Sequence, residues 1–279
     1  MSSQPPLFRQ SMPSAPPQAT GKVTFGKVTA SKIGHKFCLY GTGGIGKTTL
    51  SCYAPAPVGY VDIEQSLDKL SSQLPEDVKN NVMPLTGITD YAALRTALRS
   101  DGWESIKTIV IDSATVLEQM IVRWVIDNIP HEKGKSVQIN SIDDYGFGKG
   151  YTLVYEEFNM FLSLLDKHVQ QGRNVILIAH ECISNVPNPA GEDWIRYEPR
   201  LQSPASGKSS IRLRLKEWVD HCVFLAYDIA VNKDNKAIGG ASRTLYCSET
   251  PSCMGKSRTV KGSLCIDEPN STIWNEFLK

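Results

Sequence analysis

Residues 38–50 read C-L-Y-G-T-G-G-I-G-K-T-T-L, and this stretch decides the fold. It satisfies the pattern G-x-x-x-x-G-K-[ST] and follows a strand-like run over residues 35–40. Glycines let successive backbone N–H groups turn toward a phosphate, the lysine adds a mobile cation, and the threonine hydroxyl reaches Mg²⁺. A glycine-rich hairpin turn is the structural alternative, but the helix expected from Lys47, with its positive end toward the phosphates, favours a triphosphate site. The residues predicted to bind the nucleotide are Gly41, Thr42, Gly43, Gly44, Ile45, Gly46, Lys47, Thr48 and Thr49.

Two further strand patterns end in acidic residues. Residues 58–62 form a short apolar run that leads to Glu64, and residues 106–113 form another that closes with Asp112 and Ser113. A buried strand that ends in aspartate delivers a carboxylate to the Mg²⁺ shell, so Thr48 and Asp112 are the predicted metal residues. Many P-loop ATPases place the catalytic glutamate directly after this aspartate, where this chain has Ser113. We therefore predict that Glu64, at the ligand-binding edge of the sheet, activates water, although a surface-loop glutamate would look the same.

A third strand pattern covers residues 174–181 and carries His180 past its apolar part. A lone histidine is more often a structural residue, but the carboxyl ends of parallel strands meet at one edge of a sheet. Glu64, Asp112 and His180 are therefore expected to converge there, and we predict that His180 senses the γ-phosphate.

Composition limits the class of protein. The chain has 279 residues and a formal charge of +1, which excludes a globally basic protein, but residues 196–261 hold twelve Lys and Arg against six Asp and Glu, a net +6. This basic third could face a polyanion or could simply be solvated surface. The whole chain has seven cysteines. The three nearest the C-terminus, Cys247, Cys253 and Cys265, lack C-x-x-C spacing, and no apolar run of the chain approaches membrane-spanning length. We expect reduced thiols, no zinc site and a cytoplasmic location.

Two long polar segments interrupt the pattern of strands and helices. Residues 131–150 carry four glycines, and residues 183–210 read as irregular chain with four prolines. Aromatic and cationic residues on such loops suit base stacking and phosphate contact on single-stranded nucleic acid, although a solvated loop would look similar. The predicted DNA-binding residues are Lys149, Trp194, Arg196, Arg200 and Lys208.

The rest of the sequence predicts the domain boundaries and the remaining strands and helices. Residues 1–21 form a Pro-, Ser- and Gln-rich segment that we expect to be disordered, ahead of a single domain over residues 22–279. Residues 23–34, 211–219, 222–231 and 243–248 are expected to be strands, and residues 272–278 a closing helix. The segment Asn232–Asn235 lacks the final aspartate of the guanine-reading N-K-x-D, which argues against a GTPase.

The chain resembles the core of RecA-type recombinases. The resemblance rests on residues 41–49, on V-D-I-E-Q-S-L-D at 61–68, on I-V-I-D-S at 109–113 and on residues 175–180, and it spans about 33–265. Within that group, S-I-D-D-Y-G-F-G-K-G-Y at 141–151 is most similar to small phage-encoded RecA-core ATPases that act with single-strand DNA-binding protein. The resemblance implies an α/β fold, namely a RecA-like P-loop NTPase with a mostly parallel central sheet flanked by helices and antiparallel strands added at the C-terminal side.

The resemblance also implies roles for individual residues. Lys47 and Thr48 would bind phosphates and Mg²⁺, Glu64 would activate water, and His180 would replace the glutamine that links γ-phosphate to DNA in recombinases. Residues 131–150 and 183–210 would correspond to the two DNA-binding loops. Lys256 and Arg258 resemble the paired cations that reach the phosphate of a neighbouring subunit, which implies a homo-oligomer. The predicted catalytic residues are Glu64, Lys47, His180, Lys256 and Arg258.

The leading interpretation is a Mg²⁺-ATP-dependent ATPase that binds single-stranded DNA during recombination, annealing or strand pairing. One alternative is a RecA-core helicase or translocase motor, which would share every nucleotide-binding residue. Another is a nucleotide-gated module that binds a protein, with slow hydrolysis that is indifferent to DNA. The sequence leaves the three open.

Overall fold

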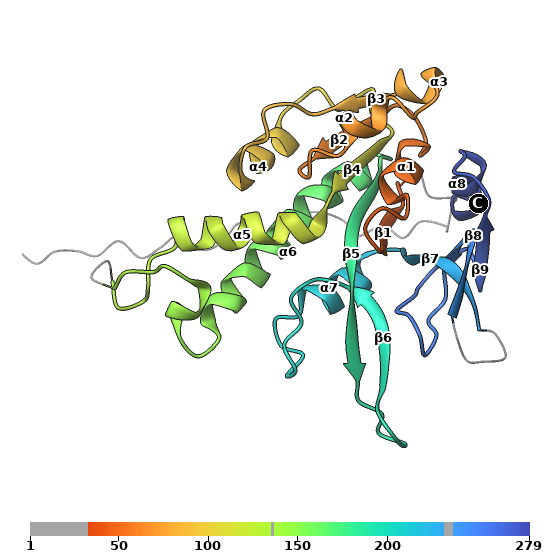
Figure 1. Cartoon of the computed structure of the whole chain (residues 1–279). Coiled ribbons are helices and arrows are strands. Elements are labelled where there is room, and N and C mark those ends of the chain that lie inside the picture. The colour runs from red at the N-terminus through yellow and green to blue at the C-terminus, as the bar shows by residue number, and fades with distance from the viewer. Residues whose placement is uncertain (1–32, 135–136, 232–236) are drawn as a thin grey trace, which may run out of the picture. The chain divides into compact units, whose positions relative to one another are not determined.

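The central feature of the fold is one mixed sheet with helices on both faces (Figure 1). The structure is a computed structural model, and it describes residues 33–134, 137–231 and 237–279. Along the sheet the strands run in the order β3-β2-β4-β5-β1-β7-β8-β9, and β6 pairs with β5 outside this path. The strands are β1 (Lys36–Gly41), β2 (Val58–Asp62), β3 (Val82–Pro84), β4 (Thr108–Asp112), β5 (Asn174–Val186), β6 (Trp194–Pro199), β7 (His221–Val231), β8 (Ala237–Tyr246) and β9 (Ser263–Ile266).

The helices divide between the two faces of the sheet. One apolar core lies under α4 (Tyr91–Arg99), α5 (Ala114–Asn128), α6 (Lys149–Gln170) and α7 (Ile211–Trp218). The other lies under α1 (Lys47–Cys52), α2 (Leu67–Ser71), α3 (Glu76–Lys79) and α8 (Thr272–Phe277). Neighbouring strand residues pack into opposite cores, because successive side chains of a strand point to opposite faces. Leu39 and Tyr40 of β1 are an example. No helix in the described ranges is long and apolar enough to cross a membrane.

The strand directions confirm the expected fold class. β1 pairs in parallel with β5 and with β7, and β4 lies in parallel between β2 and β5. β8 and β9 add antiparallel strands at the C-terminal side. The registers place Gly41 opposite His180 and Asp62 opposite Asp112, so β1, β2 and β4 end at the same edge, and β5 passes this edge at His180. The predicted N-terminal tail lies outside the described residues, as do the predicted strands up to residue 32.

The strand prediction for residues 211–219 was wrong, because residues 211–218 form α7. The alternation I-R-L-R-L mimics a half-buried strand, yet the buried residues are Ile211, Leu215 and Trp218, at helical spacing, while Leu213 is exposed. The Ser210 side chain accepts a hydrogen bond from the Leu213 backbone N–H at 3.2 Å and so caps the helix.

Both segments predicted as irregular loops contain regular structure. β5 continues past the sheet to Val186 and turns back as β6, forming a hairpin that Figure 1 shows at the carboxyl end of β5. Residues 131–150 include the 3₁₀ helix η1 (Ile142–Tyr145) and the first two residues of α6. Residues 194–199 form a strand because they pair with β5 across the turn that follows Val186.

Candidate active site

The functional residues predicted at three strand ends do lie together. Lys47, Glu64, Asp112 and His180 line one cleft of about 490 Å³ at the carboxyl edge of the sheet. α1 supplies Lys47, the loop after β2 supplies Glu64, β4 supplies Asp112 and β5 supplies His180. The remaining lining residues come from the glycine-rich loop and from α2 with its flanks: Gly43, Gly44, Gly46, Thr48, Thr49, Gln65, Ser66, Lys69, Leu70 and Gln73.

The glycine-rich loop folds around the Lys47 side chain. The Lys47 ammonium donates hydrogen bonds to the carbonyls of Gly41 and Thr42, both at 2.8 Å, and these bonds use two of its three N–H donors. Burial lowers the pKa of Lys47, against the opposing attraction of Asp112, Glu181 and Glu64. A triphosphate is a better partner for this cation than two backbone carbonyls, because a charge-assisted hydrogen bond to phosphate is stronger.

Thr48 and Asp112 form an oxygen pair suited to Mg²⁺. The Thr48 hydroxyl donates to Asp112 Oδ2 at 2.7 Å, and the Tyr60 hydroxyl donates to the same atom at 2.8 Å. Burial raises the pKa of Asp112, and these two hydrogen bonds oppose the rise. Hydroxyl and carboxylate oxygens are the hard ligands that Mg²⁺ takes alongside substrate phosphates, so the residues fit the metal. The role of Tyr60 was not predicted, because a tyrosine within an apolar strand reads as core.

Glu64 is held by two donors that leave part of its carboxylate available. The Ser113 hydroxyl donates to Glu64 Oε1, and His180 Nε2 lies 2.9 Å from the same oxygen. Burial of Glu64 opposes its ionisation, but the bonds from Ser113 and His180 and the charge of Lys47 outweigh burial, so its pKa is lowered. Among the described residues, no hydrogen bond ends on Oε2. An ionised carboxylate with one unengaged oxygen in the cleft can accept a proton from water.

Two contacts to the glycine-rich loop were not predicted. The Thr42 hydroxyl donates to Glu181 Oε1 at 2.5 Å, which ties the loop to β5 directly beside His180. Arg243, from β8, donates through Nη1 to the Ile45 carbonyl at 3.1 Å. No sequence signal could identify Arg243, because 198 positions separate it from Ile45.

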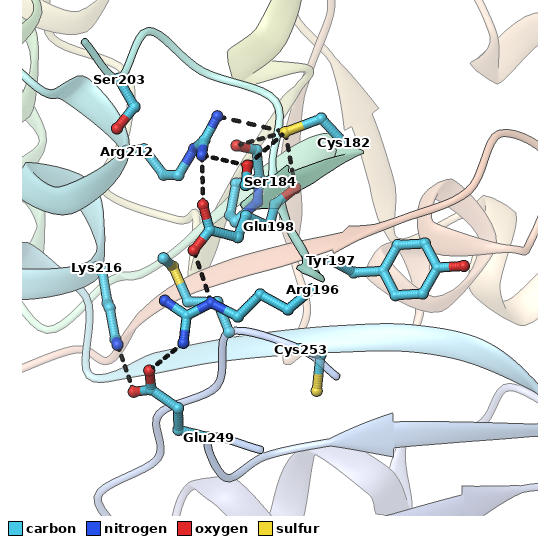
Figure 2. A network of polar contacts seen from close by, with 12 residues as sticks. Cys182, Ser184, Arg196, Tyr197, Glu198, Ser203, Arg212, Lys216, Glu249 and Cys253 are labelled. Atoms are coloured by element: carbon cyan, nitrogen blue, oxygen red, sulfur yellow. Dashed lines mark hydrogen bonds and ion pairs between the residues drawn. The ribbon is translucent and has the colours of Figure 1, made fainter. Parts of the chain in front are cut away.

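Arg196, a predicted DNA-binding residue, points into an internal network instead (Figure 2). Its Nε donates to Glu198 Oε1 at 2.7 Å and its Nη1 to Glu249 Oε1 at 2.5 Å. Arg212 of α7 also donates to Glu198, and Lys216 of α7 pairs with Glu249 at 2.5 Å. The network joins the hairpin to α7, so Arg196 is engaged within its own chain.

The other predicted DNA-binding residues differ in exposure. Arg200 and Lys208 are exposed, and Lys149 is exposed at the start of α6, where it pairs with Glu132 at 2.5 Å. Trp194 is half-buried on β6, and its indole N–H has no hydrogen-bond partner among the described residues. Of the five predicted residues, Lys149, Arg200 and Lys208 are therefore exposed, whereas Arg196 is paired within the chain and Trp194 is half-buried.

Phe147 was not predicted, yet it is the most exposed large apolar side chain of the described residues, at 104%. It lies between Gly146 and Gly148, and its own φ of 49° is in the left-handed region that a phenylalanine rarely adopts. An aromatic held in solvent on such a backbone is suited to contact with a ligand or partner.

Lys256 and Arg258 lie far from the cleft of their own chain. The Lys256 ammonium donates to the carbonyls of Lys216, Glu217 and Val219 at 3.0, 3.1 and 2.7 Å, which closes the C-terminal end of α7. Arg258 pairs through Nε with Asp220 Oδ1 at 2.7 Å, beside the amino end of β1, and its side chain is 66% exposed. Lys256 uses all three of its donors internally, whereas Arg258 remains accessible.

Comparison with known proteins gives one family match. Residues 33–259 match the AAA domain family designated AAA_24. No curated protein gives a significant match. Among solved structures, the RadB recombinase superimposes with a TM-score of 0.42 at 14% sequence identity, over 77% of this chain and 80% of that chain.

Proposed function

This chain belongs to the AAA domain family, and we propose that it is a Mg²⁺-dependent ATPase whose turnover is coupled to single-stranded DNA in recombination. One observation carries the ATPase assignment: Glu64, with a lowered pKa and an unengaged Oε2, shares a cleft with Lys47 and Asp112. This arrangement contains a phosphate-binding cation, a metal-binding pair and a base. The similarity of residues 33–265 to recombinase cores supports the DNA-coupled part of the proposal.

In the proposed reaction the chain binds the nucleotide, orients the attacking water and accepts a proton from it. Lys47 would leave the two loop carbonyls for the β- and γ-phosphates, and Thr48 and Asp112 would hold the metal. Bound Mg²⁺ supplies positive charge that neutralises the phosphates as the leaving group departs. Glu64 accepts the proton of the attacking water, while Ser113 and His180 fix the orientation of its carboxylate through Oε1.

The charge balance of the cleft supports a requirement for further cations. Three carboxylates, those of Asp112, Glu181 and Glu64, act electrostatically on Lys47. A triphosphate adds more negative charge, so one lysine cannot neutralise the site. Mg²⁺ would supply part of the missing positive charge, and a cation from a second copy of the chain would supply the rest. Arg258, exposed and distant from its own cleft, is the more accessible of the two predicted cations.

DNA contact is best supported on the segment around Phe147. The exposed ring can stack on a base, and the exposed Lys149 lies two positions away. Arg200 and Lys208 add exposed cations on the segment between β6 and α7. Arg196 is not proposed to bind DNA, because its guanidinium is paired with Glu198 and Glu249.

The ATPase proposal is tested with Glu64→Gln. Glutamine keeps the shape of the side chain but cannot accept the proton, so kcat should fall about 10²- to 10⁴-fold while Mg²⁺-ATP still binds. Glu76→Gln, on the exposed surface of α3, is the matched control and should keep wild-type turnover. Wild-type kcat in Glu64→Gln would remove Glu64 from the mechanism.

A nucleotide-gated protein-binding module is the second candidate. One face of the β5–β6 hairpin exposes Ile183, Ile195 and Tyr197, which lie on the same side because Ile183 pairs with Tyr197. Single-strand binding measured over a salt series, with ATP, ADP or no nucleotide, separates the two candidates. A salt slope that depends on nucleotide supports the DNA-coupled ATPase, and binding that ignores nucleotide, with no stimulation of ATPase by DNA, favours the protein-binding module.

A further inference from the structure

Arg243 contacts the glycine-rich loop from the side opposite the cleft. It belongs to β8, the first antiparallel strand added to the sheet, and its guanidinium donates to the Ile45 carbonyl at 3.1 Å. Gly46 separates the two sides, because it lines the cleft and also contributes to a small void beside Arg243. The arginine therefore acts on the backbone of the loop and does not line the cleft itself.

The contact fixes the orientation of one peptide plane. A trans peptide is planar, so its carbonyl and its N–H point in opposite directions. With the Ile45 carbonyl held by Arg243, the N–H of Gly46 must point away from Arg243. Backbone N–H groups turned inward in this way are what a phosphate-binding loop offers its ligand. The Ile45 side chain is buried at 2% exposure, so its own packing restrains the residue further.

The close approach also depends on glycine. A Cβ on residue 46 would lie 2.6 Å from Arg243 Nη1, and Gly46 has a φ of +103°. Both features exclude another side chain at this position while Arg243 keeps its place. Gly46 and Arg243 thus form one structural unit, although the sequence motif contains only the glycine.

We propose that Arg243 is a positioning residue for nucleotide binding, which holds the Ile45–Gly46 peptide in the orientation that receives phosphate. The inference rests on the proposed nucleotide-binding function of the cleft. It predicts that losing the guanidinium weakens nucleotide affinity and leaves the chemical step nearly intact, because Glu64, Asp112 and His180 do not contact Arg243.

The test compares Arg243→Met and Arg243→Lys with wild type, using a fluorescent ATP analogue for Kd and steady-state ATPase for KM and kcat. A hydrogen bond from a charged donor contributes about 1.5–3 kcal/mol, so Arg243→Met should raise Kd and KM at least about tenfold, with kcat changed less than about twofold. Arg243→Lys should lie between Met and wild type. Millimolar guanidinium chloride should restore affinity to Arg243→Met, whereas sodium chloride at equal ionic strength should not. Lys261→Met, on an exposed lysine of the same basic region, should match wild type.

Wild-type Kd in a folded Arg243→Met protein would overturn the inference, as would affinity loss that guanidinium does not restore. If Arg243→Met fails to fold, Arg243→Lys decides: the lysine side chain is one bond shorter and lacks the planar guanidinium, so it reaches the Ile45 carbonyl less well, and a Kd within threefold of wild type would overturn the inference. Failure of wild type to bind nucleotide would instead refute the proposed function, so the two failures are distinguishable.

Discussion

Two neighbouring carboxylates in the cleft have opposite pKa shifts. Burial raises the pKa of Asp112, and the hydrogen bonds from Thr48 and Tyr60 only reduce the rise. Burial also opposes ionisation of Glu64, yet Ser113, His180 and Lys47 outweigh it and lower the pKa. Glu64 is therefore ionised at neutral pH without a metal, whereas the charge of Asp112 depends more strongly on a cation. The proposed mechanism needs both carboxylates ionised, so a further rise in the pKa of Asp112 would move the acid limb of activity to higher pH.

Tyr60→Phe tests the electrostatic state of Asp112. Removing the hydroxyl deletes a donor that stabilises the charged carboxylate, so the pKa of Asp112 should rise further and the acid limb of kcat/KM should move to higher pH. A hydrogen bond to a charged group contributes about 1.5–3 kcal/mol, so half-saturation by Mg²⁺ should need at least about tenfold more metal. Tyr91→Phe removes a comparably buried hydroxyl from α4, away from the cleft, and should change neither value. Identical magnesium titrations for Tyr60→Phe and wild type would contradict this account.

The sequence predicted some of these residues and could not predict others. Lys47, Glu64, Asp112 and His180 follow predicted strands, and parallel strands bring their carboxyl ends to one edge. Their convergence in one cleft was therefore predictable. The contribution of Tyr60 depends on which face of β2 it occupies beside Asp112, and that of Arg243 on an antiparallel strand at the far end of the chain. Both contacts depend on tertiary register, which local sequence patterns do not encode.

Among the elements, the β5–β6 hairpin is the one that depends most on buried charge. Glu198 of β6 is 6% exposed and accepts hydrogen bonds from Arg196 and Arg212 (Figure 2). Burial raises the cost of ionising Glu198, but the two guanidinium groups outweigh that cost, so its pKa is lowered. The hairpin could not be predicted from residues 183–210, because its prolines and exposed apolar residues resemble loop, while the ion pairs that hold it to α7 are long-range.

Glu198→Gln should loosen the hairpin from α7. Two buried guanidinium groups would lose their shared negative charge, and breaking a buried pair costs about 3 kcal/mol or more in the free energy of unfolding. Hydrogen exchange should speed up in residues 182–199 more than in the parallel strands. Glu249→Gln removes a charge from the same network at a site that is 46% exposed, so its effect should stay below about 1 kcal/mol. Equal losses in the two variants would show that burial at Glu198 does not control the hairpin.

At the scale of the whole molecule, the sheet edge opposite the cleft contains a histidine pair, of which His221 is buried and His35 is half-buried. His221, at the start of β7, is 0% exposed; its Nε2 lies 3.0 Å from His35 Nδ1 and its Nδ1 lies 2.8 Å from Ser257 Oγ. Burial and the neighbouring His35 lower the pKa of His221 to about 4, with Arg258 and Lys256 adding to the effect and Asp220 opposing it. The folded protein therefore keeps His221 neutral at a pH where the unfolded chain binds a proton.

This difference makes the stability of the fold depend on pH. Between the unfolded pKa of 6.5 and the folded pKa of about 4, the unfolded state binds the extra proton, so the free energy of unfolding should fall as pH falls. The contribution is fully present above the unfolded pKa, and its loss reaches about 3 kcal/mol at the lower end of the window. Denaturant unfolding at pH 7, 6 and 5, at constant ionic strength, measures the slope. His221→Leu should flatten it, whereas His131→Gln, on the segment before α6, should keep the wild-type slope. An unchanged slope in a folded His221→Leu protein would mean that other groups cause the acid sensitivity and that the pair of His221 and His35 does not affect stability.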